Sequence, residues 1–255
     1  NLVEANFFGR GFLAMTAAYW MWREALIGLF GANSQMAAYY LVEFAAQVAA
    51  ANGYRLDYRQ MPWSQALALA RRGQVQGVIA ASPVYAGELA LTSEIAGLDV
   101  TAIAVRQPLL KKPQITALSE LDGLRLGFIQ HYVFDNGGPV DRYVLERRLN
   151  APASVTFVNS ANGLQDLLTL LAQQRIDFIF ENEAVLRYTL RLQPQPLTII
   201  TTSSVGPLHY GFTANDDGRG WAALFDAALQ QAHQDGSLAQ LMAKYGLPPL
   251  PPQPR

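Results

Sequence analysis

Cysteine is absent from this chain of 255 residues, and histidine occurs only as His131, His209 and His233. Without cysteine the chain can form neither a disulfide nor a thiolate metal site, and it has no cysteine nucleophile. The three histidines are too scattered for a recognisable metal-ligand spacing. We therefore expect no metal and no cofactor, and the cellular compartment is left open.

Charged residues are also scarce: they make up 15% of the chain, and the formal net charge is −1. A chain so close to neutral is unsuited to nucleic acid, or to an anionic membrane, as its main partner. The apolar stretch at residues 11–22 is too short to cross a bilayer, so we expect no direct membrane insertion. The chain begins with Asn rather than Met and shows no leader, which indicates a processed or truncated product.

Hydrophobic residues, by contrast, make up 51% of the chain, enough for a substantial core in one large domain or two modest lobes. The clearest unit runs from Tyr54 to Ser82. It begins with alternating apolar and polar residues, which predict a strand, and continues with a short apolar helix between a Ser64 cap and Gly73. The apolar run Val75–Ala81 predicts a second strand, parallel to the first and typical of an open α/β sheet.

The rest of the chain repeats this plan. Before the unit we expect a strand at residues 12–17 and a helix from about residue 34 to 51, and after it a strand at 99–106. A second group follows, with strands at 124–130, 155–158, 175–180 and 197–202 and helices at 140–149, 162–173 and 184–192. A strand at 209–214 and helices at 220–234 and 237–244 return to the character of the first half.

In such sheets, ligands bind beyond the carboxyl ends of the strands, so the residues that follow predicted strands are candidate ligand contacts. Aromatic side chains there can stack on a small polar ligand or cap the core. A seryl residue can bind ligand or form a turn. In the first half of the chain the candidates are Tyr19, Trp20, Trp22, Trp63 and Ser82.

The second half offers its own candidates at strand ends, namely Gln130, His131, Tyr132, Glu181, Asn182 and Tyr210. Tyr132 either contacts ligand or packs as a core aromatic. A carboxylate buried at Glu181 is costly unless a cation pairs with it, which favours a cationic or hydroxyl-rich ligand. The alternative for Glu181 is a solvated surface carboxylate.

Five segments, in their order and spacing, resemble the bacterial solute-binding proteins of the amino-acid type (solute-binding family 3), the receptors of ABC importers. They are GYRLDYRQMPWSQALALARRGQVQGVIAASP, LSELDGLRLGFIQ, LLTLLAQQRIDFIFENEAVLRY, HYGFTA and HQDGSLAQLMAKYG. The resemblance covers nearly the whole chain, from Phe12 to Gly246.

This resemblance implies a type II, periplasmic-binding-protein-like α/β fold of two lobes, each a mostly parallel sheet flanked by helices, with a two-strand hinge. Lobe one would comprise residues 1–105 and 206–246, and lobe two residues 106–205, followed by a proline-rich tail at 247–255. The resemblance also implies closure over a small polar ligand such as an amino acid or amine. The membrane permease of an ABC importer would be its partner, its location periplasmic, and a signal peptide would be removed.

Two departures from the family weigh against a standard α-amino acid as ligand. The family's amino-acid binders grip the α-carboxylate with an arginine placed shortly before the segment that matches residues 91–93. Here residues 84–88 contain no arginine, and Ala86 falls at about that place. The family also holds the ligand's ammonium with an acidic residue after the strand matching residues 175–180. Glu181 or Glu183 could do this, although Asn182 best matches the register.

Three functions follow as hypotheses. A non-catalytic binding protein is favoured because no nucleophile–base set is recognisable. The ligand-sensing ectodomain of a membrane receptor is a second hypothesis, motivated by the proline-rich tail and the missing Met. A third is an enzyme on the same scaffold, a lyase or a cell-wall-acting relative, in which Glu181, His131 and Tyr132 form a general acid–base set.

Overall fold

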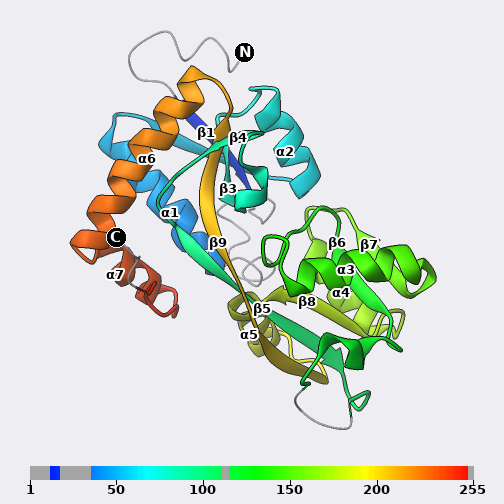
Figure 1. Ribbon diagram of the computed structural model, residues 1–255. Coiled ribbons are helices and arrows are strands. Elements are labelled where there is room, and N and C mark those ends of the chain that lie inside the picture. Colours follow the sequence, from blue (N-terminus) through cyan, green and yellow to red (C-terminus); the bar gives the residue numbers. More distant parts are fainter. Residues whose placement is uncertain (1–11, 18–35, 111–114, 252–255) are drawn as a thin grey trace.

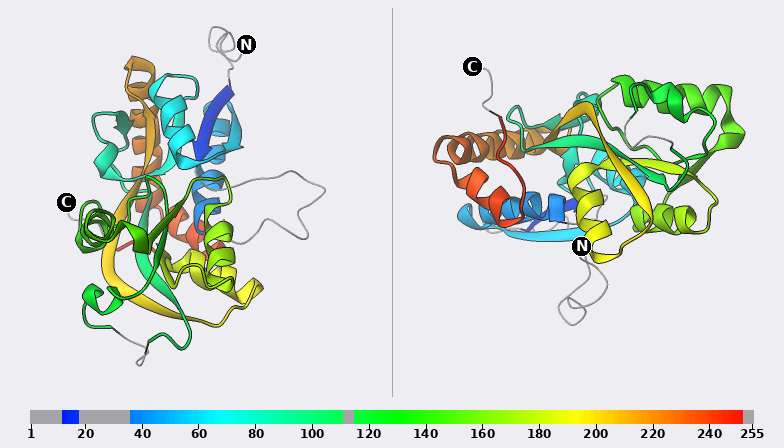
Figure 2. Two further views of the ribbon diagram at one scale, coloured as in Figure 1. Left: turned by 90° about the vertical axis from the view of Figure 1, so that its right-hand side faces the viewer. Right: turned by 90° about the horizontal axis from the view of Figure 1, so that it is seen from below.

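The computed structural model describes residues 12–17, 36–110 and 115–251. Its helices and strands form two lobes that two long strands connect (Figure 1). The further views in Figure 2 show that one of these strands, β9 (Leu197–Thr213), runs from one lobe into the other. Within the described residues, no helix combines the length and apolar character that a membrane span needs.

Lobe one contains the strand order β2-β1-β3-β9, and β4 also pairs with β9. The central strand β1 is parallel to both β2 and β3, so the two strands of the predicted unit flank β1 instead of touching each other. The strands are β1 (Phe12–Ala17), β2 (Arg55–Gln60), β3 (Gly77–Ala81) and β4 (Leu89–Leu91). The helices are α1 (Met36–Ala51), α2 (Trp63–Arg71), the short η2 (Pro83–Tyr85), α6 (Asp216–Gln234) and α7 (Ser237–Lys244).

The start of α2 corrects one prediction. Pro62 takes the N-cap position, and no side chain caps the helix, so the predicted cap by Ser64 is wrong. Proline is well suited to the beginning of a helix because it has no N–H to leave unsatisfied. The Ser64 hydroxyl instead donates to Asn159 in the other lobe, at 3.0 Å. The predicted end of the helix is confirmed, since Gly73 has the left-handed φ of 66°.

Lobe two continues the sheet in the order β9-β5-β8-β6-β7. β6 is parallel to β7 and β8, whereas the crossing strand β5 is antiparallel to its neighbours. The strands are β5 (Gly97–Arg106), β6 (Leu126–Ile129), β7 (Val155–Val158) and β8 (Phe178–Asn182). The helices are η3 (Leu118–Leu121), α3 (Pro139–Asn150), η4 (Pro152–Ser154), α4 (Gly163–Ala172) and α5 (Glu183–Leu192).

Strand alternation divides the core of lobe two into two layers. Phe178 and Phe180 of β8 pack in one cluster with Val140 of α3, and Ile179 packs in another with Leu167 of α4. Helices therefore cover both faces of this sheet, which is why both faces of β8 carry apolar side chains. The carboxyl end of β8 is held between these layers.

The crossing strands correct a second prediction. The strands expected at residues 197–202 and 209–214 are one continuous strand, β9. Its Pro207 pairs with β5, and β3 joins β9 only from His209 onward. Pro207 has no N–H to donate, but at this position β9 pairs with β5 and not yet with β3. The ladder with β5 therefore continues past the proline. The lobe boundaries at residues 105 and 205 stay a prediction.

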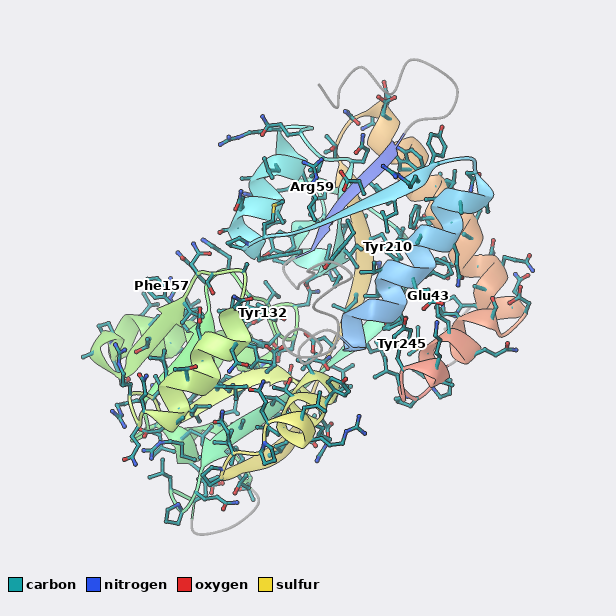
Figure 3. All side chains as sticks on the ribbon, turned by 180° about the vertical axis from the view of Figure 1, so that it is seen from behind. Glu43, Arg59, Tyr132, Phe157, Tyr210 and Tyr245 are labelled. Carbon is teal, nitrogen blue, oxygen red and sulfur yellow. The ribbon has the colours of Figure 1, made fainter. Side chains whose placement is uncertain are left out.

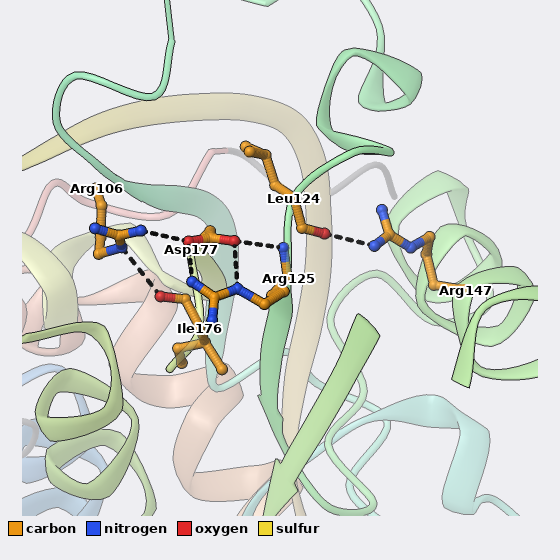
Figure 4. Close-up of polar contacts among 6 residues, drawn as sticks. All are labelled: Arg106, Leu124, Arg125, Arg147, Ile176 and Asp177. Carbon is orange, nitrogen blue, oxygen red and sulfur yellow. Dashed lines mark hydrogen bonds and ion pairs between the residues drawn. The ribbon is translucent and has the colours of Figure 1, made fainter. Parts of the chain in front are cut away.

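An ion cluster fixes the opposite end of β8 (Figure 4). The Asp177 carboxylate accepts hydrogen bonds of 2.8 Å from Nε and Nη2 of Arg125, and Nη2 of Arg106 lies 2.5 Å from its Oδ1. These bonds, above all those from Arg125, hold the pKa of Asp177 well below its usual range. The cluster ties together the ends of β5, β6 and β8.

Candidate functional site

Residues 130–137, here called the site loop, connect β6 to α3. Two carboxylates fix this loop onto the helix. Asp135 accepts hydrogen bonds from the backbone N–H groups of Val140 and Asp141, at 2.8 and 3.0 Å. Asp141 accepts in return from Phe134 at 2.9 Å and Gly137 at 2.8 Å. Carboxylates are stabilised at a helix N-terminus by its free N–H groups and its dipole, so the loop is held in one conformation.

Two polar side chains of lobe one donate hydrogen bonds to the site loop. The Ser82 hydroxyl, directly after β3, donates to Oδ1 of Asn136 at 3.3 Å. The Tyr85 hydroxyl, on η2, donates to the backbone carbonyl of His131 at 2.9 Å. The donors Ser82 and Tyr85 are both buried, whereas the acceptors His131 and Asn136 lie at the surface, so the two bonds are part-buried. The loop thus meets the carboxyl end of a lobe-one strand, the place at which the sequence predicts a ligand site.

Trp63 contacts the Tyr85 side chain within lobe one. Its indole N–H donates to the Tyr85 hydroxyl at 3.0 Å, and the two rings meet edge to face with centroids 5.6 Å apart. Trp63 also packs with Leu67 and Val78 in the lobe-one core. The structure therefore uses Trp63 to position Tyr85.

Two buried carboxyl groups lie near the site loop. Glu181, near the end of β8, is 1% exposed and accepts hydrogen bonds from the Tyr132 hydroxyl at 3.3 Å and the Asn182 backbone N–H at 2.8 Å. Asp99, on β5, is 7% exposed and accepts from the Asn182 side chain at 2.9 Å. Asn182 also caps α5, where its Oδ1 accepts from Val185 at 3.2 Å. Figure 3 labels Tyr132 where lobe two faces lobe one.

Burial raises the pKa of Glu181 to about 8 and the pKa of Asp99 to about 7. The cause is the loss of water around the charged form, and hydrogen bonds from neighbouring groups offset it only in part. Burial also raises the pKa of Tyr132 well above its usual value, so its hydroxyl keeps its proton and donates. Among the described residues, Asp99 forms no salt bridge. At neutral pH this pair can therefore hold protons, and a positive charge placed beside it would favour both carboxylates.

Solved structures of similar fold align with nearly the whole chain. An ancestral arginine-binding protein bound to arginine aligns with a TM-score of 0.72 and 16% identity, over 93% of this chain and 99% of that one. The chain has a periplasmic-binding-protein fold. A histidine kinase sensor domain with similarity to periplasmic binding proteins aligns with a TM-score of 0.72 and 18% identity, over 94% and 99% of the two chains. The substrate-binding protein of an amino acid ABC transporter aligns with a TM-score of 0.69 and 14% identity, over 92% and 99%.

No protein-family model matches the sequence, and no curated protein matches it in sequence. The structural similarities, by contrast, confirm the predicted fold class, and the resemblance on which it was based, at the level of the periplasmic-binding-protein fold. Among the described residues, no group of His, Asp and Glu side chains has the arrangement of a metal site.

The periplasmic-binding-protein fold brings most of the described candidates together around the site loop. Tyr132, Glu181 and Asn182 meet at the carboxyl pair, and Ser82 meets the loop from lobe one. The His131 side chain is exposed, and its backbone has a left-handed φ of 64°. Gln130 directly follows β6, and its backbone N–H donates to the Val158 carbonyl at 2.9 Å. Tyr19, Trp20 and Trp22 lie outside the described residues, so their ligand contacts stay predictions.

Tyr210 lies elsewhere, in the core of lobe one beside α1 (Figure 3). It is 0% exposed, its hydroxyl donates to the Leu41 carbonyl at 2.6 Å, and its ring packs on Phe225. This position suits core packing, and we leave Tyr210 out of the proposed site.

Three residues of this site were missed from the sequence: Tyr85, Asp99 and Asn136. Asp99 carried a usable signal, because it stands at the start of the predicted strand at 99–106, which is mostly apolar and in which burying a carboxyl is costly. Asn136 precedes two glycines, a pattern that predicts a turn but not a contact with another lobe. Tyr85 stands next to Ala86, and nothing in the local pattern indicates that it faces the second lobe.

Proposed function

We propose that this protein is a non-catalytic solute-binding protein whose lobes close on a small cationic solute, such as an amine, a guanidine or a cationic amino acid. The observation that carries the proposal is the buried carboxyl pair of Glu181 and Asp99 beside the site loop, with the pKa of both groups raised. Buried carboxyls are costly as anions, and a bound cation offsets that cost. Binding then favours the closed arrangement, because only there do both lobes contribute to the site.

Delivery to the permease of an ABC importer outside the cytoplasm is part of this proposal. Its support is the fold, shared with the substrate-binding protein of an amino acid ABC transporter and with a protein bound to arginine. Ala86, at the place of the family's carboxylate-binding arginine, is exposed at the end of η2. The proposal therefore favours amines and guanidines over solutes that need a grip on an α-carboxylate.

Calorimetric titration of solute-free protein tests the proposal. The protein is unfolded, dialysed and refolded to remove solute that copurifies, and is then titrated with cationic amino acids, diamines, guanidines, and neutral and acidic controls. We expect binding by a cationic member, and a loss of about 100-fold in affinity in Glu181→Gln, because a bound cation loses a buried counter-charge.

Glu183→Gln is the matched control. Glu183 is the next acidic residue in the chain, but it forms a salt bridge with Arg187 on the surface of α5. This variant should bind as the unmodified protein does. Equal losses in Glu181→Gln and Glu183→Gln, or binding of acidic solutes alone, would contradict a role for the buried pair.

A second candidate is the ligand-sensing domain of a membrane receptor. The observation that favours it is the likeness to a histidine kinase sensor domain over 94% of this chain. The gene sequence beyond residue 255 distinguishes the two: a membrane span followed by a kinase or other signalling domain supports the sensor, and a stop codon supports the importer component.

A further inference from the structure

Three side-chain hydrogen bonds join the lobes directly, between residues that lie outside the crossing strands β5 and β9. Ser64 bonds to Asn159 at 3.0 Å, Ser82 bonds to Asn136 at 3.3 Å, and Tyr85 bonds to the His131 carbonyl at 2.9 Å. Every donor comes from lobe one and every acceptor from lobe two. We call these three bonds the latch. Because no solute takes part in them, they stabilise contact between the lobes by themselves.

The central bond of the latch is fixed on its lobe-one side. The Tyr85 hydroxyl accepts from the Trp63 indole at 3.0 Å and donates to His131, so both of its roles are taken. Burial raises the pKa of Tyr85, which keeps the hydroxyl protonated and therefore a donor. The hydroxyl therefore has one acceptor in lobe two, and opening of the lobes breaks this bond.

Backbone strain gathers at the same contact. Four residues other than glycine in the described chain have positive φ, and three of them belong here: Ala80 at 65°, His131 at 64° and Asn136 at 54°. His131 and Asn136 supply latch acceptors, and Ala80 lies two residues before Ser82, at an irregularity in the pairing of β3 with β9. Such conformations persist where surrounding contacts hold them, and they are frequent at clamps that close on a ligand.

From this geometry we infer that Tyr85, with Ser64 and Ser82, holds the two lobes together when no solute is bound. Tyr85 is thus a positioning residue: it sets the closed fraction of the empty protein, and through that fraction the apparent affinity for solute. The inference goes beyond the proposed function, because it concerns the empty protein and holds whatever the solute is.

The absence of cysteine makes a distance measurement direct. Gln74→Cys in lobe one and Glu146→Cys in lobe two introduce two exposed labelling sites, and pulsed electron resonance between spin labels there reports the separation of the lobes without solute. Tyr85→Phe removes the latch hydroxyl and keeps the ring. We expect one short distance in the parent protein. In Tyr85→Phe we expect a second, longer distance, with the closed-to-open ratio lowered about fivefold, the effect of one net hydrogen bond.

Tyr54→Phe is the matched control, because the Tyr54 ring packs against Trp221 within lobe one, away from the latch. It should keep the parent distance. The double variant Ser64→Ala, Ser82→Ala provides an independent test if Tyr85→Phe does not fold, and it should also populate the longer distance. The inference is overturned if the empty parent protein already shows the longer distance as its main population, or if the folded latch variants match Tyr54→Phe. Neither result depends on whether a cationic solute is ever found.

Discussion

The two ends of β8 place acidic side chains in opposite electrostatic surroundings. At the start of the strand, Asp177 lies among the guanidinium groups of Arg106 and Arg125, and its pKa falls. Four residues later, Glu181 is buried beside the site loop, and its pKa rises to about 8. The first arrangement stabilises the folded chain at neutral pH, and the second costs stability there. Such a cost at a buried position is typical of a group kept for binding.

The largest effect expected is the loss of the Asp177 ion cluster. Asp177→Asn leaves the Arg106 guanidinium, which is mostly buried, without its counter-charge. We expect the free energy of unfolding to fall by about 3 kcal/mol, measured by urea denaturation at pH 7. Asp216→Asn, which removes an exposed ion pair with Arg219, is the control and should leave the denaturation midpoint in place. A small effect of Asp177→Asn would remove the contrast between the two ends of β8.

Glu181→Gln should raise the free energy of unfolding, and the size of the increase should depend on pH. A carboxyl whose folded pKa is about 8, against an ordinary value of 4.5, contributes fully below pH 4.5 and loses that contribution as pH rises through 8. Relative to Glu181→Gln, the unmodified protein should lose about 4 kcal/mol of stability between pH 4.5 and 8. Denaturation curves at four pH values check this, and a difference independent of pH would contradict the raised pKa.

Binding of a cationic solute should release protons from the carboxyl pair. At pH 6.5 we expect roughly one proton released per solute, falling to none above pH 9, because the bound cation favours both carboxylates. Titration calorimetry in two buffers with different ionisation enthalpies measures this number. Uptake of protons, or no exchange at any pH, would argue that the solute is held elsewhere.

The smallest effect expected is that of Tyr132→Phe. The Tyr132 hydroxyl donates to Glu181 at 3.3 Å and lowers the pKa of that carboxyl slightly against the larger effect of burial. Removing it should raise the pKa of Glu181 further and cost less than about 1 kcal/mol of stability. The titration of the Glu181 side-chain carbon, followed by NMR, checks the direction. A fall in that pKa would show that the hydroxyl does not act as a donor.

Sequence patterns were enough for the elements that depend on local periodicity. The strands β1 and β7 have the predicted bounds, and each end of α4 lies within one residue of its predicted position. The prediction failed where long-range pairing decides the outcome. Gly206 and Pro207 look like the end of a strand, but pairing with β5 carries β9 through them. Ser64 looks like a helix cap, but its hydroxyl has a partner in the other lobe.

The candidate site was predictable only in part, for the same reason. Strand ends pointed to Ser82, Tyr132 and Glu181, because the position of a strand end follows from local sequence. Asp99 and Tyr85 contribute through contacts 83 and 46 residues away in sequence, which no local pattern reveals. The identity of the solute depends on such pairings, so it could not be derived from sequence.

The placement of β9 has a consequence for how the chain is made. This strand is the neighbour of β3 in lobe one and of β5 in lobe two, yet it lies near the C-terminus of the chain. During synthesis from the N-terminus, β1, β2 and β3 are made first, and the edge of β3 stays unpaired until β9 has been synthesised. Lobe two can therefore complete its sheet only once residue 208 has emerged, and lobe one only once residue 213 has, so both sheets are completed late in synthesis.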